Sequence, residues 1–167
     1  PQCPRRRLAR PRGGKWVSGG AVRREPDGEH TGAADRCGAN SGAGADVDPI
    51  VKLEPDGRVV QSFGAGQILW PHGMDVDRQG NVWVADARSA TDVELKSFPN
   101  AARKGHTVIK FSPQGKMLMT LGTPGEAGDP PARFTEPNDV LLAPAGSLFV
   151  AEAHSAHPDA VGRLVDY

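Results

Sequence analysis

A repeat of roughly 60 residues, glycine-centred turns and strands that are apolar on both faces predict an all-β fold, a partial β-propeller of four-stranded antiparallel blades. Gly and Pro number 21 and 15 in 167 residues, which indicates many turns and argues against a helical bundle. At this length the chain supplies about two and a half such blades. We therefore expect that it cannot close a ring alone.

The repeat is visible in two gapless alignments within the chain. Residues 50–64 align with residues 108–122, and residues 71–87 align with residues 137–153. A fainter copy comes first, with its turn at Pro26-Asp27-Gly28 and a strand end at Ala34-Asp35. Residues 163–167 begin another copy of 107–111. The predicted domain organisation is a disordered basic tail over 1–15 and a propeller domain over 16–167, with blades at about 16–64, 71–122 and 137–167.

Each repeat predicts four strands, here called a to d in chain order. The clearest copy predicts strands at about 73–77, 81–86, 107–111 and 116–121. Tight turns join a to b and c to d, because a glycine that tolerates positive φ follows shortly after Pro or Asp in each of them: Gly28, Gly57, Gly80, Gly115 and Gly146. The connection from b to c, residues 88–106, is long enough for one short helix ending before Pro99.

The b strands decide how the sheets pack. Residues 82–85 (Val-Trp-Val-Ala) and 148–151 (Leu-Phe-Val-Ala) are apolar at successive positions, so both faces of these strands need cover. Sheets stacked face to face around an axis supply that cover. A two-sheet sandwich ranks second, because it would give a cleaner inward–outward alternation and no long repeat.

Composition excludes several classes of partner. The 20 basic and 20 acidic residues cancel, and eight of the basic residues but no acidic residue precede Glu25, which leaves the rest of the chain acidic. No nucleic-acid partner is therefore expected, and no apolar run is long enough to span a membrane. Cys3 and Cys37 could pair in an oxidising compartment, although two unrelated thiols is the simpler interpretation.

The strand order places the candidate functional residues at one end of the blades. The glycine turns share one end, and the longer b-to-c and d-to-a connections share the other, where function usually resides. Arg36, His72, the 88–106 insertion and His154 all fall at this irregular end. His72 opens an innermost strand at the mouth of the central channel, and Asn138 and Asp139 hold the equivalent place one blade later.

One repeat of this chain resembles the NHL repeat of six-bladed propellers. The resemblance rests on the hairpin Met74-Asp-Val-Asp through Asn81-Val-Trp-Val-Ala-Asp86 and on the following Val108-Ile-Lys-Phe and Gly115. Phe63-Gly64 through Pro71-His72-Gly73, and Arg36-Cys37-Gly38, resemble the peptidyl-α-hydroxyglycine α-amidating lyases within that class. The NHL likeness covers 50–167 and extends faintly over 16–49.

The resemblance implies a chemistry for three residues. His72 would be one of three zinc-binding histidines supplied by different blades, and Arg36 would grip the substrate. His154 stands where the lyases have a proton-accepting tyrosine, and an imidazole can also act as a base. The resemblance further implies a calcium ion in the channel near Met74, and it favours a secreted or periplasmic location. We expect this chain to be inactive alone.

Two other functions remain open. A non-catalytic NHL module would hold a peptide or a protein at the channel mouth, whereas the lyase would take a peptide substrate there. A lactonase-like metal hydrolase would need several acidic ligands converging on the channel, and only Asp139 is well placed.

Other conspicuous residues are expected to be structural. Asp35, Asp86 and Glu152 end b strands, where a carboxylate can accept N–H groups from the following turn. Three tryptophans are expected in the core or between blades: Trp16, Trp70 and Trp83. His106 is assigned no role.

Overall fold

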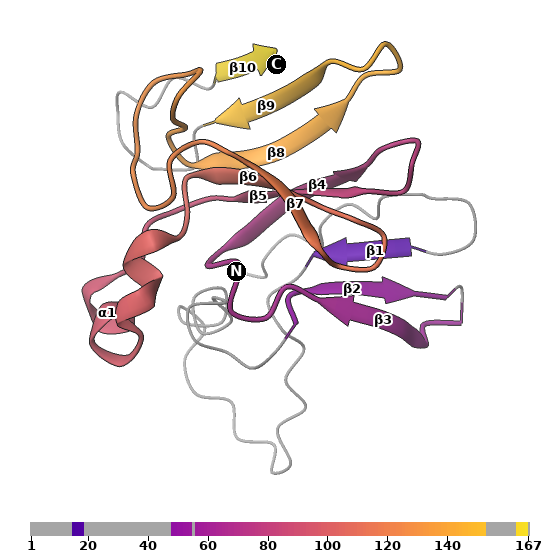
Figure 1. Ribbon diagram of the computed structural model, residues 1–167, viewed down its shortest axis with the longest axis horizontal. Coiled ribbons are helices and arrows are strands. Elements are labelled where there is room, and N and C mark those ends of the chain that lie inside the picture. The colour runs from indigo at the N-terminus through magenta and orange to yellow at the C-terminus, as the bar shows by residue number, and fades with distance from the viewer. Residues whose placement is uncertain (1–14, 19–47, 55, 153–162, 167) are drawn as a thin grey trace, which may run out of the picture.

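The computed structural model describes residues 15–18, 48–54, 56–152 and 163–166, and its strands form three antiparallel sheets (Figure 1). The strand orders are β1-β2-β3, β4-β5-β6-β7 and β10-β9-β8. In chain order the strands are β1 Lys15–Ser18, β2 Ile50–Leu53, β3 Val59–Phe63, β4 Pro71–Val76, β5 Val82–Asp86, β6 Thr107–Phe111, β7 Met117–Leu121, β8 Pro137–Leu142, β9 Leu148–Glu152 and β10 Arg163–Asp166. The predicted all-β fold with four-stranded antiparallel blades is confirmed.

The turns within the sheets have the predicted chemistry. Gly57, Gly80, Gly115 and Gly146 have φ angles of 88°, 85°, 84° and 105°, the left-handed region where a side chain is disfavoured. Each of these glycines donates its N–H to the carbonyl oxygen of the residue three positions earlier. Each turn reverses the chain between paired strands, and in Figure 1 the turns lie on the right while α1 lies on the left.

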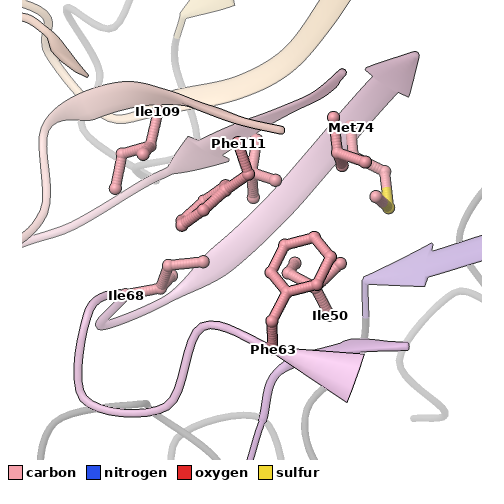
Figure 2. Packing of buried hydrophobic residues seen from close by; sticks show 8 residues of the cluster. Ile50, Phe63, Ile68, Met74, Ile109 and Phe111 are labelled. Carbon is pink, nitrogen blue, oxygen red and sulfur yellow. The ribbon is translucent and has the colours of Figure 1, made fainter. Parts of the chain in front are cut away.

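The middle strand β5 is buried at all five positions, as the apolar sequence of its two faces predicts. Val82 and Val84 pack toward the first sheet, together with Ile50 and Phe63 (Figure 2). The rings of Phe63 and Phe111 lie 5.2 Å apart between centroids.

The opposite face of β5 packs toward the third sheet. Trp83 and Ala85 share a buried cluster with Val140 and Val150 of that sheet, and with Phe134 from the preceding loop. Because sheets cover both sides of β5, the described strands form stacked blades.

The first sheet differs from the sequence prediction in one respect. We expected strand b of that blade to end near Ala34-Asp35, but β1, Lys15–Ser18, is the strand paired with β2. The segment around Ala34 lies outside the described residues. In the third sheet, β10 pairs with β9 in the position of a c strand, as the partial repeat at residues 163–167 predicts.

The long connection between β5 and β6 contains α1, Asp92–Ser97, and the 3-10 helix η1, Pro99–Arg103. The predicted short helix that ends before Pro99 is therefore confirmed. Among the described residues, no helix has the length and apolar character needed to cross a membrane.

Candidate functional site

The candidate site lies where β4 of the second sheet meets β8 of the third sheet. His72, the second residue of β4, has a side chain that is only 6% exposed. Its Nδ1 atom lies 2.5 Å from the carbonyl oxygen of Asn138 in β8. Since a carbonyl oxygen can only accept, Nδ1 carries the ring proton, and in the neutral ring Nε2 carries the lone pair.

A glycine allows the two strands to approach at this point. A Cβ atom at Gly73 would collide with Oδ1 and Cα of Asp139 and with the carbonyl oxygen of Asn138. The residue after His72 therefore has to lack a side chain for β4 to lie this close to β8. This close packing holds the imidazole against the Asn138 carbonyl.

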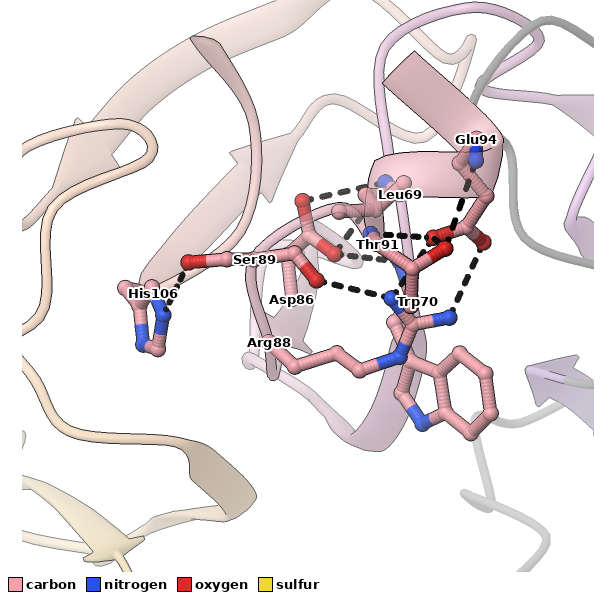
Figure 3. A network of polar contacts seen from close by, with 8 residues as sticks. All are labelled: Leu69, Trp70, Asp86, Arg88, Ser89, Thr91, Glu94 and His106. Atoms are coloured by element: carbon pink, nitrogen blue, oxygen red, sulfur yellow. Dashed lines mark hydrogen bonds and ion pairs between the residues drawn. The ribbon is translucent and has the colours of Figure 1, made fainter. Parts of the chain in front are cut away.

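Asp86 fixes the loops that lead into the site (Figure 3). Its carboxylate is fully buried and accepts the backbone N–H groups of Leu69, Trp70 and Gly105, the last at 2.9 Å. Burial raises the pKa of Asp86, against the opposing effects of these donors and of the Lys104 charge.

The structural role expected for Asp86 is borne out by these contacts, but the donors differ from those expected. They come from the loops that precede β4 and β6, not from the turn that directly follows β5. In the next sheet Glu152 accepts the N–H of Thr135, again from the loop before an inner strand. The carboxylates at the ends of β5 and β9 thus tie each inner strand to its own sheet.

The 88–106 insertion is anchored beside the site. Thr91 and Glu94 form a reciprocal capping box at the start of α1. Arg88 makes two hydrogen bonds of 2.9 Å to the Glu94 carboxylate, and its guanidinium lies 4.1 Å from the Trp70 ring centroid. Trp70, two residues before His72, is therefore packed against the insertion, which fits the packing role expected for it.

His106 takes a place that the sequence did not reveal. Its side chain is 4% exposed, and its Nδ1 accepts the N–H of Glu136 at 3.2 Å. Its Nε2 lies 2.8 Å from Oγ of Ser89, so in the neutral ring Nε2 donates to the serine. Burial lowers the pKa of His106, although the Glu136 charge opposes this.

The other predicted site residues, Arg36 and His154, lie outside the described residues, as do Cys3 and Cys37. Within the described ranges, no group of three or more His, Cys, Asp or Glu side chains is arranged to hold a metal ion. The tautomer of His72 would suit one zinc ligand, because a zinc-bound histidine commonly donates its other ring N–H to a carbonyl oxygen, as Nδ1 of His72 does here. A full ligand set would need residues beyond those ranges.

A cleft lies at the opposite, glycine-turn end, between the second and third sheets. Its volume is about 520 Å³, and its lining includes Trp83, Lys110 and Pro144. Lys110 lies over the Trp83 ring and contacts Asp77 at 3.2 Å, so these two charges pair with each other, and Arg78 also lines the cleft. The cleft lies away from His72, which is not among its lining residues.

The proteins of known name that are similar to this chain include amidating enzymes and an NHL repeat protein. No family model matches the chain. The probable peptidyl-alpha-hydroxyglycine alpha-amidating lyase of Caenorhabditis elegans is 31% identical over 106 residues, which is 63% of this chain and 26% of that protein. Peptidyl-glycine alpha-amidating monooxygenase of Mus musculus is 32% identical over 64% of this chain and 10% of its own length.

Two further similar proteins are an NHL repeat protein and a solved structure. NHL repeat-containing protein 3 of Mus musculus is 25% identical over 65% of this chain and 29% of its own length. A solved structural genomics protein of unknown function from Bacteroides thetaiotaomicron matches with a TM-score of 0.48 at 21% identity, over 62% of this chain and 27% of that one.

The three sheets thus have the arrangement of β-propeller blades, and the chain is similar to an NHL repeat protein. The resemblance to the peptidyl-α-hydroxyglycine α-amidating lyases is also confirmed, and the chain spans about a quarter of the Caenorhabditis elegans relative.

Proposed function

We propose that this chain supplies part of the active site of a propeller lyase that cleaves the N–Cα bond of a peptidyl-α-hydroxyglycine. The observation that carries the proposal is the hydrogen bond from Nδ1 of His72 to the Asn138 carbonyl oxygen. It selects the tautomer whose Nε2 can bind a metal. The similarity to named amidating lyases supplies the reaction class.

In the proposed reaction the hydroxyl proton leaves, the C–O bond becomes a carbonyl and the N–Cα bond breaks. The amide nitrogen takes up a proton, so the products are a peptide amide and glyoxylate. A zinc ion, when bound, would make the substrate hydroxyl more acidic. His72 would be one of its ligands.

Two residues outside the described ranges would complete the chemistry on this chain. Arg36 would bind the substrate carboxylate, for which a planar guanidinium is well suited. His154 would accept the hydroxyl proton, a task that an imidazole can perform near neutral pH. A calcium ion near Met74 is part of the same proposal and would support the channel.

The test compares glyoxylate release by the protein that contains this chain with that of its His72→Ala and Arg58→Ala variants. Arg58 is a suitable control because its side chain is 66% exposed and it directly precedes β3, at the glycine-turn end of the first sheet. In the parent and in the control we expect zinc bound in stoichiometric amount and release of glyoxylate. In His72→Ala we expect both the zinc binding and the glyoxylate release to be lost. Glyoxylate release that persists without zinc would refute the proposal.

The second candidate function is a non-catalytic module that binds a peptide at the same end. It is favoured by two exposed apolar side chains on the insertion, Val93 at 74% and Phe98 at 42% exposure. This function predicts no bound metal and tolerance of His72→Ala. It also predicts weaker peptide binding when Val93 and Phe98 are both changed to Ser, measured by calorimetry.

A further inference from the structure

The tautomer of His72 depends on a neighbouring sheet. Its Nδ1–H donates to a backbone carbonyl, that of Asn138, and not to a side chain of its own strand. Because the acceptor belongs to the main chain, the position of the segment Thr135–Asn138 determines whether this hydrogen bond forms. Any residue that fixes this segment also fixes the imidazole.

The segment Thr135–Asn138 has an unusual backbone. Glu136 has a φ of 51°, in the left-handed region that a glutamate seldom adopts. Such a conformation persists only when surrounding contacts hold it. The N–H of Glu136 donates to Nδ1 of His106, and the N–H of the preceding residue, Thr135, donates to the Glu152 carboxylate.

His106 is held in an equally unusual conformation. Its φ is 55°, and a Cβ atom at Gly122 would approach the His106 carbonyl oxygen to 2.7 Å, so the backbone around it is closely packed. Its other ring nitrogen contacts Oγ of Ser89 in the insertion. One buried imidazole therefore connects the insertion, the start of β6 and the start of β8.

We propose that His106 is a positioning residue for His72. Ser89 contacts Nε2 of His106, and Nδ1 of His106 accepts the N–H of Glu136. Two residues after Glu136, the carbonyl oxygen of Asn138 accepts the Nδ1–H of His72. Without the acceptor at Nδ1 of His106, the Glu136 turn can relax and carry the Asn138 carbonyl away. The role of the oriented His72 as a metal ligand rests on the proposed function, whereas the positioning itself does not.

The experiment measures the tautomer of His72 in the metal-free protein from the 15N chemical shifts of its ring, assigned with a His72→Gln variant. His106→Ala removes both ring contacts. His106→Asn is the matched control, because its side-chain oxygen can replace Nδ1 as acceptor and asparagine tolerates positive φ.

In the parent and in His106→Asn we expect the proton of His72 to reside almost wholly on Nδ1. In His106→Ala we expect a mixture of the two tautomers. If His106→Ala does not fold, His106→Gln takes its place, since its terminal amide can reach Ser89 but no atom of it lies at the position of Nδ1, the acceptor for the Glu136 N–H. Ser89→Ala, at an exposed position, is expected to move the His72 proton from Nδ1 to Nε2 in a smaller fraction of the molecules than His106→Ala does.

An unchanged His72 tautomer in the folded His106 and Ser89 variants would overturn the inference, as would a mixture in His106→Asn equal to that in His106→Ala. The readout needs no zinc and no substrate. If the parent neither binds zinc nor releases glyoxylate, but His106→Ala still shows the expected mixture of His72 tautomers, the positioning role is retained and the lyase is rejected.

Discussion

Asp86 shows how one buried carboxylate can support an entire loop system. It accepts three backbone N–H groups, those of Leu69 and Gly105 in buried hydrogen bonds and that of Trp70 in a part-buried one, and each buried donor left without an acceptor costs about 1–3 kcal/mol. We expect Asp86→Ala to lower the free energy of unfolding by at least about 3 kcal/mol. Asp86→Asn should cost less, because one oxygen acceptor remains.

The measurement is chemical denaturation followed by tryptophan fluorescence. Asp92→Ala, at an exposed position in the first turn of α1, is the control and should cost no more than about 1 kcal/mol. Equal losses in the Asp86→Ala and Asp92→Ala variants would contradict the structural role of Asp86.

Asp77 should make stability depend on pH. Burial acts to raise its pKa, but hydrogen bonds from Asn81, Lys110 and Trp83 outweigh burial, so the pKa lies below its ordinary value of 3.8. A lowered pKa in the folded state means that ionised Asp77 stabilises the fold above pH 3.8 and that this contribution is lost as the pH falls through the folded value.

Asp77→Asn should therefore lose about 1–3 kcal/mol at neutral pH and progressively less below pH 3.8. Unfolding measured from pH 7 down to acid checks this. Gly57→Ala changes no titratable group, so its effect should not depend on pH. A constant difference between the parent and Asp77→Asn across the range would show that the carboxylate charge is not involved.

At the scale of elements, the insertion depends on a close approach between its two ends. Gly105 has a φ of 85°, and a Cβ atom there would collide with the carbonyl oxygen of Arg88. Gly57 has almost the same φ, 88°, but a Cβ atom there meets nothing within 4 Å. These two glycines separate the cost of the backbone conformation from the cost of a collision.

We expect Gly57→Ala to cost about 1 kcal/mol, which is the strain of positive φ for a residue with a side chain. Gly105→Ala should cost distinctly more, because the Arg88 backbone has to move and the N–H of Gly105 loses its place against Asp86. Thermal unfolding of both variants checks this, and equal shifts would mean that the insertion adapts freely.

The sequence predicts an element well where its pattern is local. The apolar residues Val82 to Ala85 predict a strand with both faces covered, and Pro99 predicts the end of α1, as the structure shows. The strand paired with β2 could not be found in this way. Lys15–Ser18 has no counterpart in the repeat, and its pairing depends on a contact between distant parts of the chain.

The same limit applies to the candidate site. His72 can be picked out because Pro71-His72-Gly73 resembles a known motif. The carbonyl that orients it, at Asn138, is a main-chain atom and leaves no mark on residue type. His106 and Glu136 meet only because two loops approach each other in positive-φ conformations, which nothing in their sequence indicates.

At the scale of the whole molecule, the stacking of blades depends on side chains that lie between sheets. Phe134 comes from the loop before β8, has no exposed surface and packs with Trp83 and Val108 of the second sheet. Removing a buried phenylalanine typically costs about 3–5 kcal/mol, because a cavity remains. The loss should loosen the third sheet from the second, since Phe134 belongs to the cluster between them.

Phe134→Ala should therefore destabilise the protein by about 3–5 kcal/mol. Phe98→Ala, at a side chain that is 42% exposed on the insertion, should change stability by about 0.5 kcal/mol or less. Hydrogen exchange can locate the effect: amides of β8 and β9 should lose protection first in Phe134→Ala, while β5 and β6 stay protected. Uniform loss across both sheets would show instead that the two blades unfold as one unit.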